Sequence, residues 1–153
     1  MTDLNDYFNP VSIESPDYDF LSGQAVFSHT ITIHTENSRI GDLSKFRIAI
    51  LGVPEGRNSP NSGTSKGPDA VRAQLYRYAK IPGKARIIDL GNMKPGTTFN
   101  DTVAGLSDIL VTLIGENVFP VIIGGSSALV PALDRAMLVM KKKYTLTAVD
   151  SRI

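Results

Sequence analysis

Two short segments near the end of the chain carry the side chains best suited to chemistry. Gly124-Gly125-Ser126-Ser127 offers two hydroxyls, and Val149-Asp150-Ser151-Arg152 offers a carboxylate and a guanidinium. A guanidinium can clamp a carboxylate through two parallel hydrogen bonds, and carboxylates are ligands for hard divalent metal ions. Ser126, Ser127, Asp150 and Arg152 are therefore the candidate site residues. The plainer alternative is that Asp150 caps the next turn or pairs with Arg152.

The first segment also allows a nucleophilic serine. Gly124 to Ala128 is one residue short of the G-x-S-x-G nucleophile elbow, and it lies between an expected strand and an expected helix, as that motif requires. Ser126 would be the nucleophile. The last glycine of the motif is replaced by Ala128, and no histidine follows to serve as the base, so a serine hydrolase is the less favoured reading. Gly124 and Gly125 equally suit close packing of a strand against a helix.

Other catalytic residue types are scarce. The chain has no cysteine, so a disulfide framework, a thiolate metal site and a cysteine nucleophile are all excluded within it. Its two histidines, His29 and His34, are five residues apart, and this odd spacing puts them on opposite faces if the segment is a strand. We expect each to have a structural or surface role.

Composition narrows the class of partner. Sixteen basic and 15 acidic side chains give a net charge of +1, which offers no broad electrostatic footprint for nucleic acid. No stretch approaches the roughly 18 consecutive apolar residues of a membrane span, and the amino terminus lacks the features of a signal peptide. We therefore expect a cytoplasmic protein with small-molecule or protein partners, and neither nucleic acid nor membrane.

The elements that position the candidate site are predicted from the hydrophobic pattern. Residues 1–44 form a polar leader in which Thr30 to His34 alternates like an edge strand or a hairpin arm. From residue 45 onward, short apolar runs alternate with helical periods. The expected core strands are 46–53, 86–90, 119–123 and 145–149, of which 46–53 and 119–123 are expected to be buried. The first expected helix begins at Pro68, with Val71, Leu75 and Tyr78 recurring at helical spacing. The second begins at a cap on Asn100 or Asp101, and the third at Ala128.

Strands that alternate with helices pair in parallel through right-handed crossovers. The expected fold class is accordingly α/β, a three-layer α/β/α sandwich with a mainly parallel sheet, favoured over an α/β barrel. Ligands of open α/β sheets lie beyond the carboxyl ends of the strands. The turns after Val53, Leu90, Ile123 and Val149 are thus expected to line one rim and to hold the site.

These segments, in this order, resemble the ureohydrolases, the family of arginase, agmatinase and formimidoylglutamase. Gly52-Val53-Pro54 resembles the G-x-P loop that opens the family's pattern, and Gly67-Pro68-Asp69-Ala70-Val71-Arg72 matches its G-P-x-A-[IV]-R helix start at every fixed position. The family continues with an aspartate-glycine turn, a P-V-[IV]-x-G-G-D-H-S turn and a strand ending D-A-H-x-D. Each has a counterpart here, and the resemblance spans Lys45 to Arg152. Arg57-Asn58 resembles formimidoylglutamase in particular.

The resemblance implies a fold like that of arginase and the hydrolysis of carbon–nitrogen bonds in linear amidines or guanidines by a hydroxide bridging two manganese ions. Asp150 corresponds to one metal ligand. Ser127 and Arg152 stand where the family has histidines, and neither a hydroxyl nor a guanidinium replaces an imidazole as a manganese ligand. The resemblance therefore implies manganese as cofactor in the family but an altered metal site in this sequence.

We expect residues 45–153 to be the amino-terminal part of an arginase-like domain, incomplete because the sequence stops directly after an expected core strand. As such a fragment, the chain is not expected to be catalytically competent. The alternative is a homologue without catalysis that binds an amidine or amino-acid-like ligand, or serves in an oligomer, with Ser126, Ser127 and Arg152 as polar contacts. A homo-oligomer is expected of the full-length protein.

Overall fold

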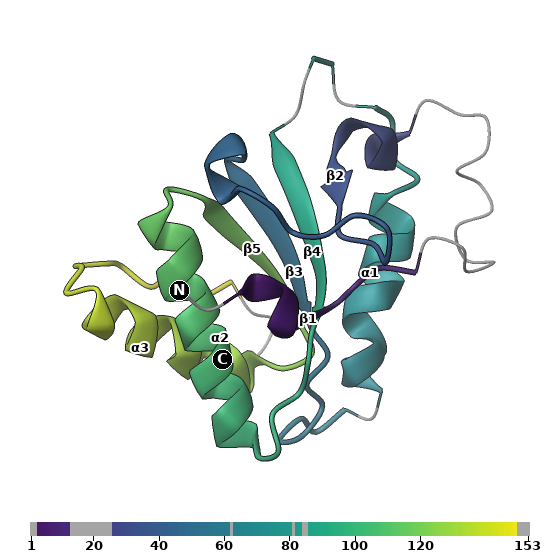
Figure 1. The fold of residues 1–153 in the computed structure, drawn as a ribbon. Coiled ribbons are helices and arrows are strands. Elements are labelled where there is room, and N and C mark those ends of the chain that lie inside the picture. The colour runs from purple at the N-terminus through teal and green to yellow at the C-terminus, as the bar shows by residue number, and fades with distance from the viewer. Residues whose placement is uncertain (1–2, 13–25, 62, 81, 84–85, 150–153) are drawn as a thin grey trace.

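The computed structural model describes residues 3–12, 26–61, 63–80, 82–83 and 86–149. Its centre is a five-stranded sheet (Figure 1). The strands are β1 (Phe8–Asn9), β2 (Thr32–Ile33), β3 (Ile48–Val53), β4 (Ile87–Met93) and β5 (Phe119–Gly124). They lie in the order β1-β4-β3-β5, with β2 also paired to β4. Only β1 is antiparallel to its neighbour, so the sheet is mainly parallel, as predicted.

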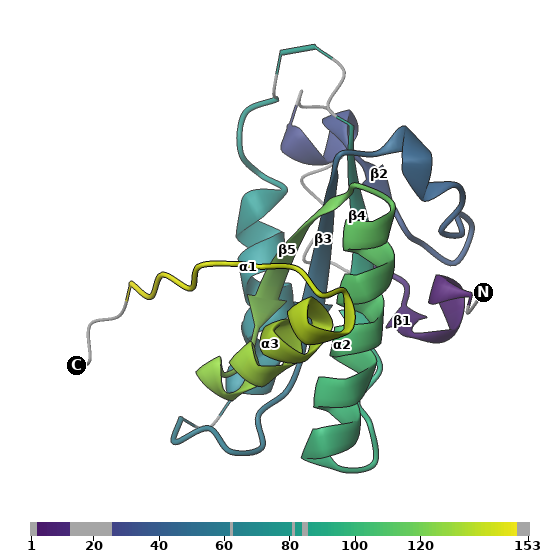
Figure 2. The same cartoon turned by 90° about the vertical axis from the view of Figure 1, so that its left-hand side faces the viewer.

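Three helices cover the two faces of this sheet. Helix α1 (Gly67–Leu75) lies on one face, and α2 (Phe99–Gly115) with α3 (Val130–Val139) lies on the other (Figure 2). Short 3₁₀ helices span Leu4–Asp6, Phe27–Thr30, Leu43–Lys45, Thr64–Lys66 and Ser127–Leu129. The predicted three-layer α/β/α arrangement is confirmed.

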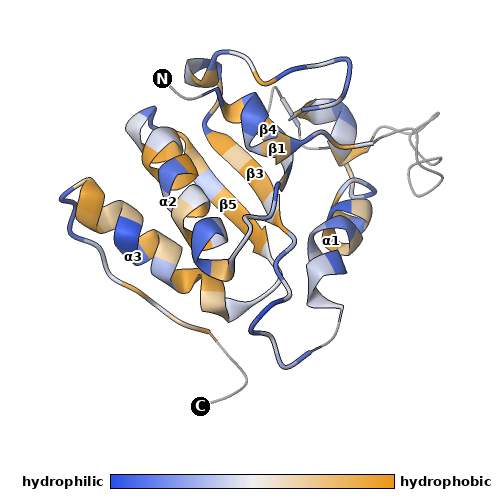
Figure 3. Ribbon diagram, turned by 60° about the horizontal axis from the view of Figure 1, so that its bottom comes forward, coloured by the Kyte–Doolittle hydropathy of each residue, from blue (hydrophilic) through white to orange (hydrophobic). Residues whose placement is uncertain are grey.

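The core follows from the two-residue period of the strands. In β3, Ala49, Leu51 and Val53 pack toward α2, whereas Ile50 packs toward α1 beside Tyr76. The central strands are apolar along most of their length, and the helices alternate between polar and apolar residues (Figure 3). The strand is thus buried on both faces, as its continuous apolar run predicts.

Helix α2 begins earlier than predicted. Its N-cap is Thr98, whose hydroxyl accepts a hydrogen bond from the Asp101 backbone, while the Asp101 carboxylate accepts one from the Thr98 backbone. This reciprocal capping box satisfies two backbone donors at the helix start. Asp101 is therefore the third residue of the helix rather than its cap.

The buried face of α1 also differs from the prediction. Val71 is 49% exposed and Tyr78, beyond the end of the helix, is 67% exposed, whereas Arg72 and Tyr76 are enclosed. The reason lies outside the helix: Asp89 of β4 faces α1 and draws the polar side chains inward. Apolar periodicity alone could not show this.

Two predictions toward the end of the chain are wrong. The strand predicted at 119–123 is confirmed as β5, but its predicted burial is not, since Phe119, Val121 and Ile122 are exposed. Among the described strands β5 pairs only with β3, at an edge of the sheet. Residues 145–149 were expected to be a core strand but have no regular structure, and Val149 is 99% exposed. A strand is stable only when its backbone groups form hydrogen bonds with a neighbouring strand. Residues 145–149 have no such neighbour among the described strands, so their sequence pattern alone does not make them a strand.

The leader packs onto the domain's own sheet. Phe8 of β1 is almost completely buried, and β1 pairs with Asn92 and Met93 of β4. The predicted strand at 30–34 is reduced to Thr32–Ile33, preceded by a 3₁₀ helix, and it pairs in parallel with β4 rather than as a hairpin arm. Across the described residues, no helix is both long and apolar enough to cross a bilayer.

Candidate functional site

The predicted rim exists where β3 and β5 end side by side. The Gly125 backbone N–H donates to the Val53 carbonyl at 3.1 Å, which holds the turn after β5 against the loop after β3. A Cβ on Gly125 would collide with the backbone carbonyl of Glu55 and would press on Thr64. Gly125 is therefore required by the close approach of two loops, the packing role that the sequence allowed.

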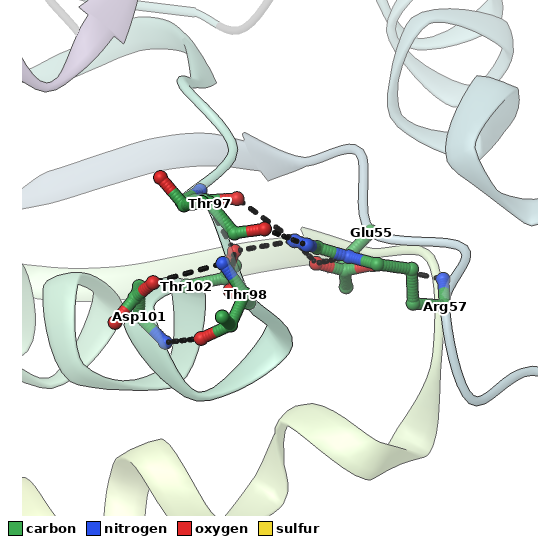
Figure 4. A network of polar contacts seen from close by, with 7 residues as sticks. Glu55, Arg57, Thr97, Thr98, Asp101 and Thr102 are labelled. Carbon is green, nitrogen blue, oxygen red and sulfur yellow. Dashed lines mark hydrogen bonds and ion pairs between the residues drawn. The ribbon is translucent and has the colours of Figure 1, made fainter.

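An ion pair between the buried Glu55 and the partly exposed Arg57 fixes the loop after β3 (Figure 4). Glu55 is 3% exposed, and the Arg57 guanidinium donates to its carboxylate from Nε at 2.9 Å and from Nη2 at 2.6 Å. The backbone N–H of Arg57 adds a third donor at 2.8 Å. The hydrogen bonds from Arg57 hold the pKa of the Glu55 carboxyl below its ordinary value, and Glu55 raises the pKa of Arg57 in return.

The same guanidinium reaches the start of α2. It donates to the carbonyls of Gly96 and Thr97 at 3.2 and 3.0 Å and to the Thr102 hydroxyl at 3.0 Å. Arg57 thus joins the loop after β3 to the loop that leads into α2, and its donors are occupied by protein atoms. Arg57 is the first residue of the Arg57-Asn58 pair that resembles formimidoylglutamase. Its role in this structure is to link two loops.

Ser126 and Ser127 lie at the rim, directly after β5, as predicted. The Ser126 hydroxyl is half-buried and accepts a hydrogen bond from the Ala128 backbone at 3.2 Å, which caps the 3₁₀ helix Ser127–Leu129. Ser127 is exposed at the start of that helix. The Ser127 side chain is the freer of the two to meet a ligand.

The backbone at Ser126 does not favour the nucleophile elbow. That motif places its serine on a sharp, strained turn. Ser126 has φ −144° and ψ 145°, an ordinary extended conformation, and its hydroxyl serves as a cap. The geometry therefore gives the serine hydrolase reading no support.

The other two predicted site residues, Asp150 and Arg152, lie outside the described residues. Within the described ranges, no three histidine, cysteine, aspartate or glutamate side chains are close enough to hold a metal ion together. The described part of the rim, with Ser127 in the position of a family histidine, does not fit a dimanganese centre.

The structure reveals a second polar centre, which the sequence analysis did not identify. Arg72 of α1 and Asp89 of β4 form an ion pair with Nε–Oδ2 2.9 Å apart, at 1% and 0% exposure, and the Tyr76 hydroxyl donates to the same carboxylate at 2.9 Å. Burial alone would lower the pKa of Arg72, but the adjacent Asp89 carboxylate raises it above its ordinary value. Arg72 also donates to Asn92 at 3.1 Å.

Arg72, the last residue of the Gly67–Arg72 motif, therefore anchors α1 to β4. A signal was present in the sequence, since Asp89 interrupts an otherwise apolar strand and a buried carboxylate demands a partner. Which arginine supplies that partner is decided only by the fold.

Comparison with known proteins identifies the family. The family model described as Arginase matches residues 46–151, so the chain belongs to the arginase family. Formiminoglutamase from Trypanosoma cruzi, solved with Mn²⁺, is similar at 25% identity and TM-score 0.58, covering 65% of this chain and 37% of that one. An agmatine ureohydrolase from Thermoplasma volcanium is similar at 12% identity and TM-score 0.56, covering 80% and 41%.

A hypothetical agmatinase from Burkholderia thailandensis shares the fold as well, at 18% identity and TM-score 0.59, with 78% of this chain and 39% of that one covered. No match was found among curated protein sequences. The chain spans about two fifths of the length of these solved structures.

Proposed function

We propose that this chain is the amino-terminal part of a formimidoylglutamase-like ureohydrolase whose metal centre is altered. Membership of the arginase family supports the ureohydrolase class. Two structures of the Trypanosoma cruzi formiminoglutamase, at 25% and 27% identity, support the subclass better than the agmatinase structures, which share the fold at 18% identity or less.

One observation carries the proposal that the site is altered. Ser127 stands exposed at the carboxyl end of β5, where the family resemblance has a metal-binding histidine. A neutral hydroxyl is a poor ligand for a divalent ion compared with imidazole or carboxylate. With Arg152 at a second histidine position, a fixed positive charge would oppose metal binding further.

Metal analysis of the full-length protein tests this proposal. After incubation with Mn²⁺ and desalting, we expect well under one manganese ion per chain and no detectable turnover of formiminoglutamate. The matched variant carries Ser127→His together with Arg152→His, and it is expected to retain more manganese than the unaltered protein. Stoichiometric manganese with formiminoglutamate turnover in the unaltered protein would refute the altered site.

The intact architecture of the rim favours a second candidate. The Glu55–Arg57 pair and Gly125 hold the loops in place although the metal ligands are changed. A homologue without catalysis would bind an amidine or amino-acid-like ligand at this rim, with Arg152 clamping its carboxylate. Calorimetry with formiminoglutamate in the presence of EDTA would then show binding that Arg152→Ala abolishes and Lys142→Ala retains.

We also propose where this protein is located in the cell and how it assembles. A cytoplasmic location and a homo-oligomeric full-length protein are consistent with a cysteine-free α/β chain of this family. Size-exclusion chromatography with light scattering on the full-length protein tests the assembly, and a monomer at micromolar concentration would contradict it.

A further inference from the structure

β1 and β2 lie end to end along one edge of β4, and a small cavity opens beside their junction. β2 pairs with the first half of β4, and β1 pairs with its last two residues, Asn92 and Met93. Between them, Gly91 has φ 87°, and a Cβ there would collide with the Asn9 carbonyl. The cavity has a volume of about 270 Å³. It lies beside β4, on the side of the sheet opposite β5 and its rim.

His34 lines this cavity in a defined tautomer. Its side chain is largely enclosed, at 6% exposure, and Nδ1 lies 2.8 Å from the Leu90 carbonyl oxygen. A carbonyl oxygen can only accept, so Nδ1 carries a proton. Nε2 forms no hydrogen bond with the described residues, so it can accept one from a ligand when the ring is neutral.

Charges of both signs surround the same cavity. Asp6 and Glu36 contribute exposed carboxylates that accept no hydrogen bond from the described residues. Arg39 and Lys94 contribute exposed cations, and one Arg39 nitrogen also donates to the Asp3 carboxylate at 3.2 Å. Lys94 is held near the cavity by donating from Nζ to the Asp6 carbonyl at 3.0 Å. Two carboxylates suit an ammonium group, and two cations suit a carboxylate.

We propose that the cavity at the β1–β2 junction binds the ammonium and carboxylate groups of a free α-amino acid. The ammonium donates to Nε2 of His34 and to the carboxylates of Asp6 and Glu36, while Arg39 and Lys94 bind the carboxylate. The balance of charge selects a zwitterion over a simple anion or cation, because either of these leaves one pair of charges without a partner. This site is separate from the rim and requires no metal.

The test uses nuclear magnetic resonance on the full-length protein with L-alanine as probe, at fixed pH and with EDTA present. The His34 Cε1–H signal, assigned by its loss in His34→Gln, is expected to shift and saturate at millimolar L-alanine. The signal of His29, which is exposed in the 3₁₀ helix Phe27–Thr30, is expected to stay still. N-acetyl-L-alanine lacks the ammonium and L-alaninamide lacks the carboxylate, and each is expected to bind at least about ten-fold more weakly.

Glu36→Gln is expected to leave the fold intact, because the Glu36 side chain is exposed and makes no hydrogen bond within the described residues. It is expected to weaken L-alanine binding about ten-fold, and Lys142→Gln, a distant exposed control, is expected to leave it unchanged. A His34 signal that does not move, or that moves equally with the two blocked derivatives, would overturn the proposal. Neither result depends on manganese or on hydrolysis, so failure here is distinct from failure of the proposed function.

Discussion

At the scale of single residues, two polar pairs decide how the loops and helices of this domain are held. Arg72 and Asp89 are both enclosed, and Asp89 also accepts hydrogen bonds from Tyr76 and from the Gly91 backbone at 2.9 Å. Arg57 and Glu55 form the second pair, which holds the loop after β3 at the rim. A buried charge that loses its partner is left unsolvated, so each pair is a point of sensitivity.

Asp89→Ala is expected to destabilise the domain by about 3 kcal/mol, because it leaves the buried Arg72 guanidinium with only the exposed Asp69 carboxylate as counter-charge. Urea unfolding followed by circular dichroism measures the change. The control is Arg39→Ala, which breaks the exposed pair with Asp3 and is expected to change the unfolding midpoint little, since solvent screens surface pairs. Equal effects of the two substitutions would show that the Arg72–Asp89 pair does not anchor α1.

Glu55 predicts a pH dependence at the rim. Hydrogen bonds from Arg57 lower the pKa of Glu55 below its ordinary value of 4.5, so the ionised form is favoured in the folded state. This stabilisation is fully present above the unfolded-state pKa and is lost as the pH falls through the lowered folded-state value. The melting temperature of Glu55→Gln should therefore fall less steeply below the ordinary pKa than that of the unaltered protein.

Glu36→Gln, at an exposed position outside the helices and strands, is the matched control and should keep the unaltered acid profile. If Glu55→Gln and the unaltered protein lose stability in parallel on acidification, the rim pair does not contribute to acid sensitivity.

At the scale of elements, backbone approach matters as much as side-chain packing. The turn after β5 can lie against the loop after β3 only because residue 125 has no side chain. The same reasoning applies to Gly91, where the backbone of β1 reaches β4. Gly125 follows β5 and Gly91 lies within β4, and neither is distinguishable in the sequence from glycines that face open space.

Gly125→Ala is expected to destabilise the domain by about 1–3 kcal/mol, because the new Cβ must push the Glu55 backbone aside. Gly115→Ala, where nothing lies within 4 Å of the added Cβ at the end of α2, is expected to stabilise by about 0.5–1 kcal/mol. Opposite signs in thermal unfolding would confirm the close approach. A neutral Gly125→Ala would show that the two loops separate easily.

At the scale of the whole molecule, β5 forms an open edge of the sheet among the described strands. β5 pairs with β3 on one side only, and it exposes Phe119, Val121 and Ile122. An exposed apolar edge strand offers unpaired backbone groups to another chain. This edge lies on the opposite side of β3 from β4, so the leader, which pairs with β4, does not cover it.

We therefore expect this chain on its own to self-associate through β5. A lysine on an edge strand opposes such pairing, so Ile122→Lys should lower the association measured by sedimentation velocity over a range of concentrations. Val71→Lys introduces the same charge at an exposed position on α1 and should leave association unchanged. Association unaffected by Ile122→Lys would place the contact elsewhere.

The sequence by itself determined the layers of this protein and the family. Apolar runs of strand length separated by helical periods require a parallel sheet with helices on both faces, and β3, β4, α1, α2 and α3 all lie within a few residues of their predicted ranges. The ordered motifs, which depend only on local residue types, indicated the arginase family that the family model confirms.

Only the tertiary structure decided which faces are buried and which polar groups meet. The burial of Arg72 over Val71, the exposure of β5 and the unpaired state of residues 145–149 each depend on a neighbour that is distant in the sequence. Ser126 and Ser127 were found at the rim from the chain order, but the cap on Ser126 and the Glu55–Arg57 pair beside it required the fold. The physical reason is that the periodicity of a sequence reports only which residues are polar and which are apolar. Burial and pairing depend on contacts with residues that are distant in the sequence.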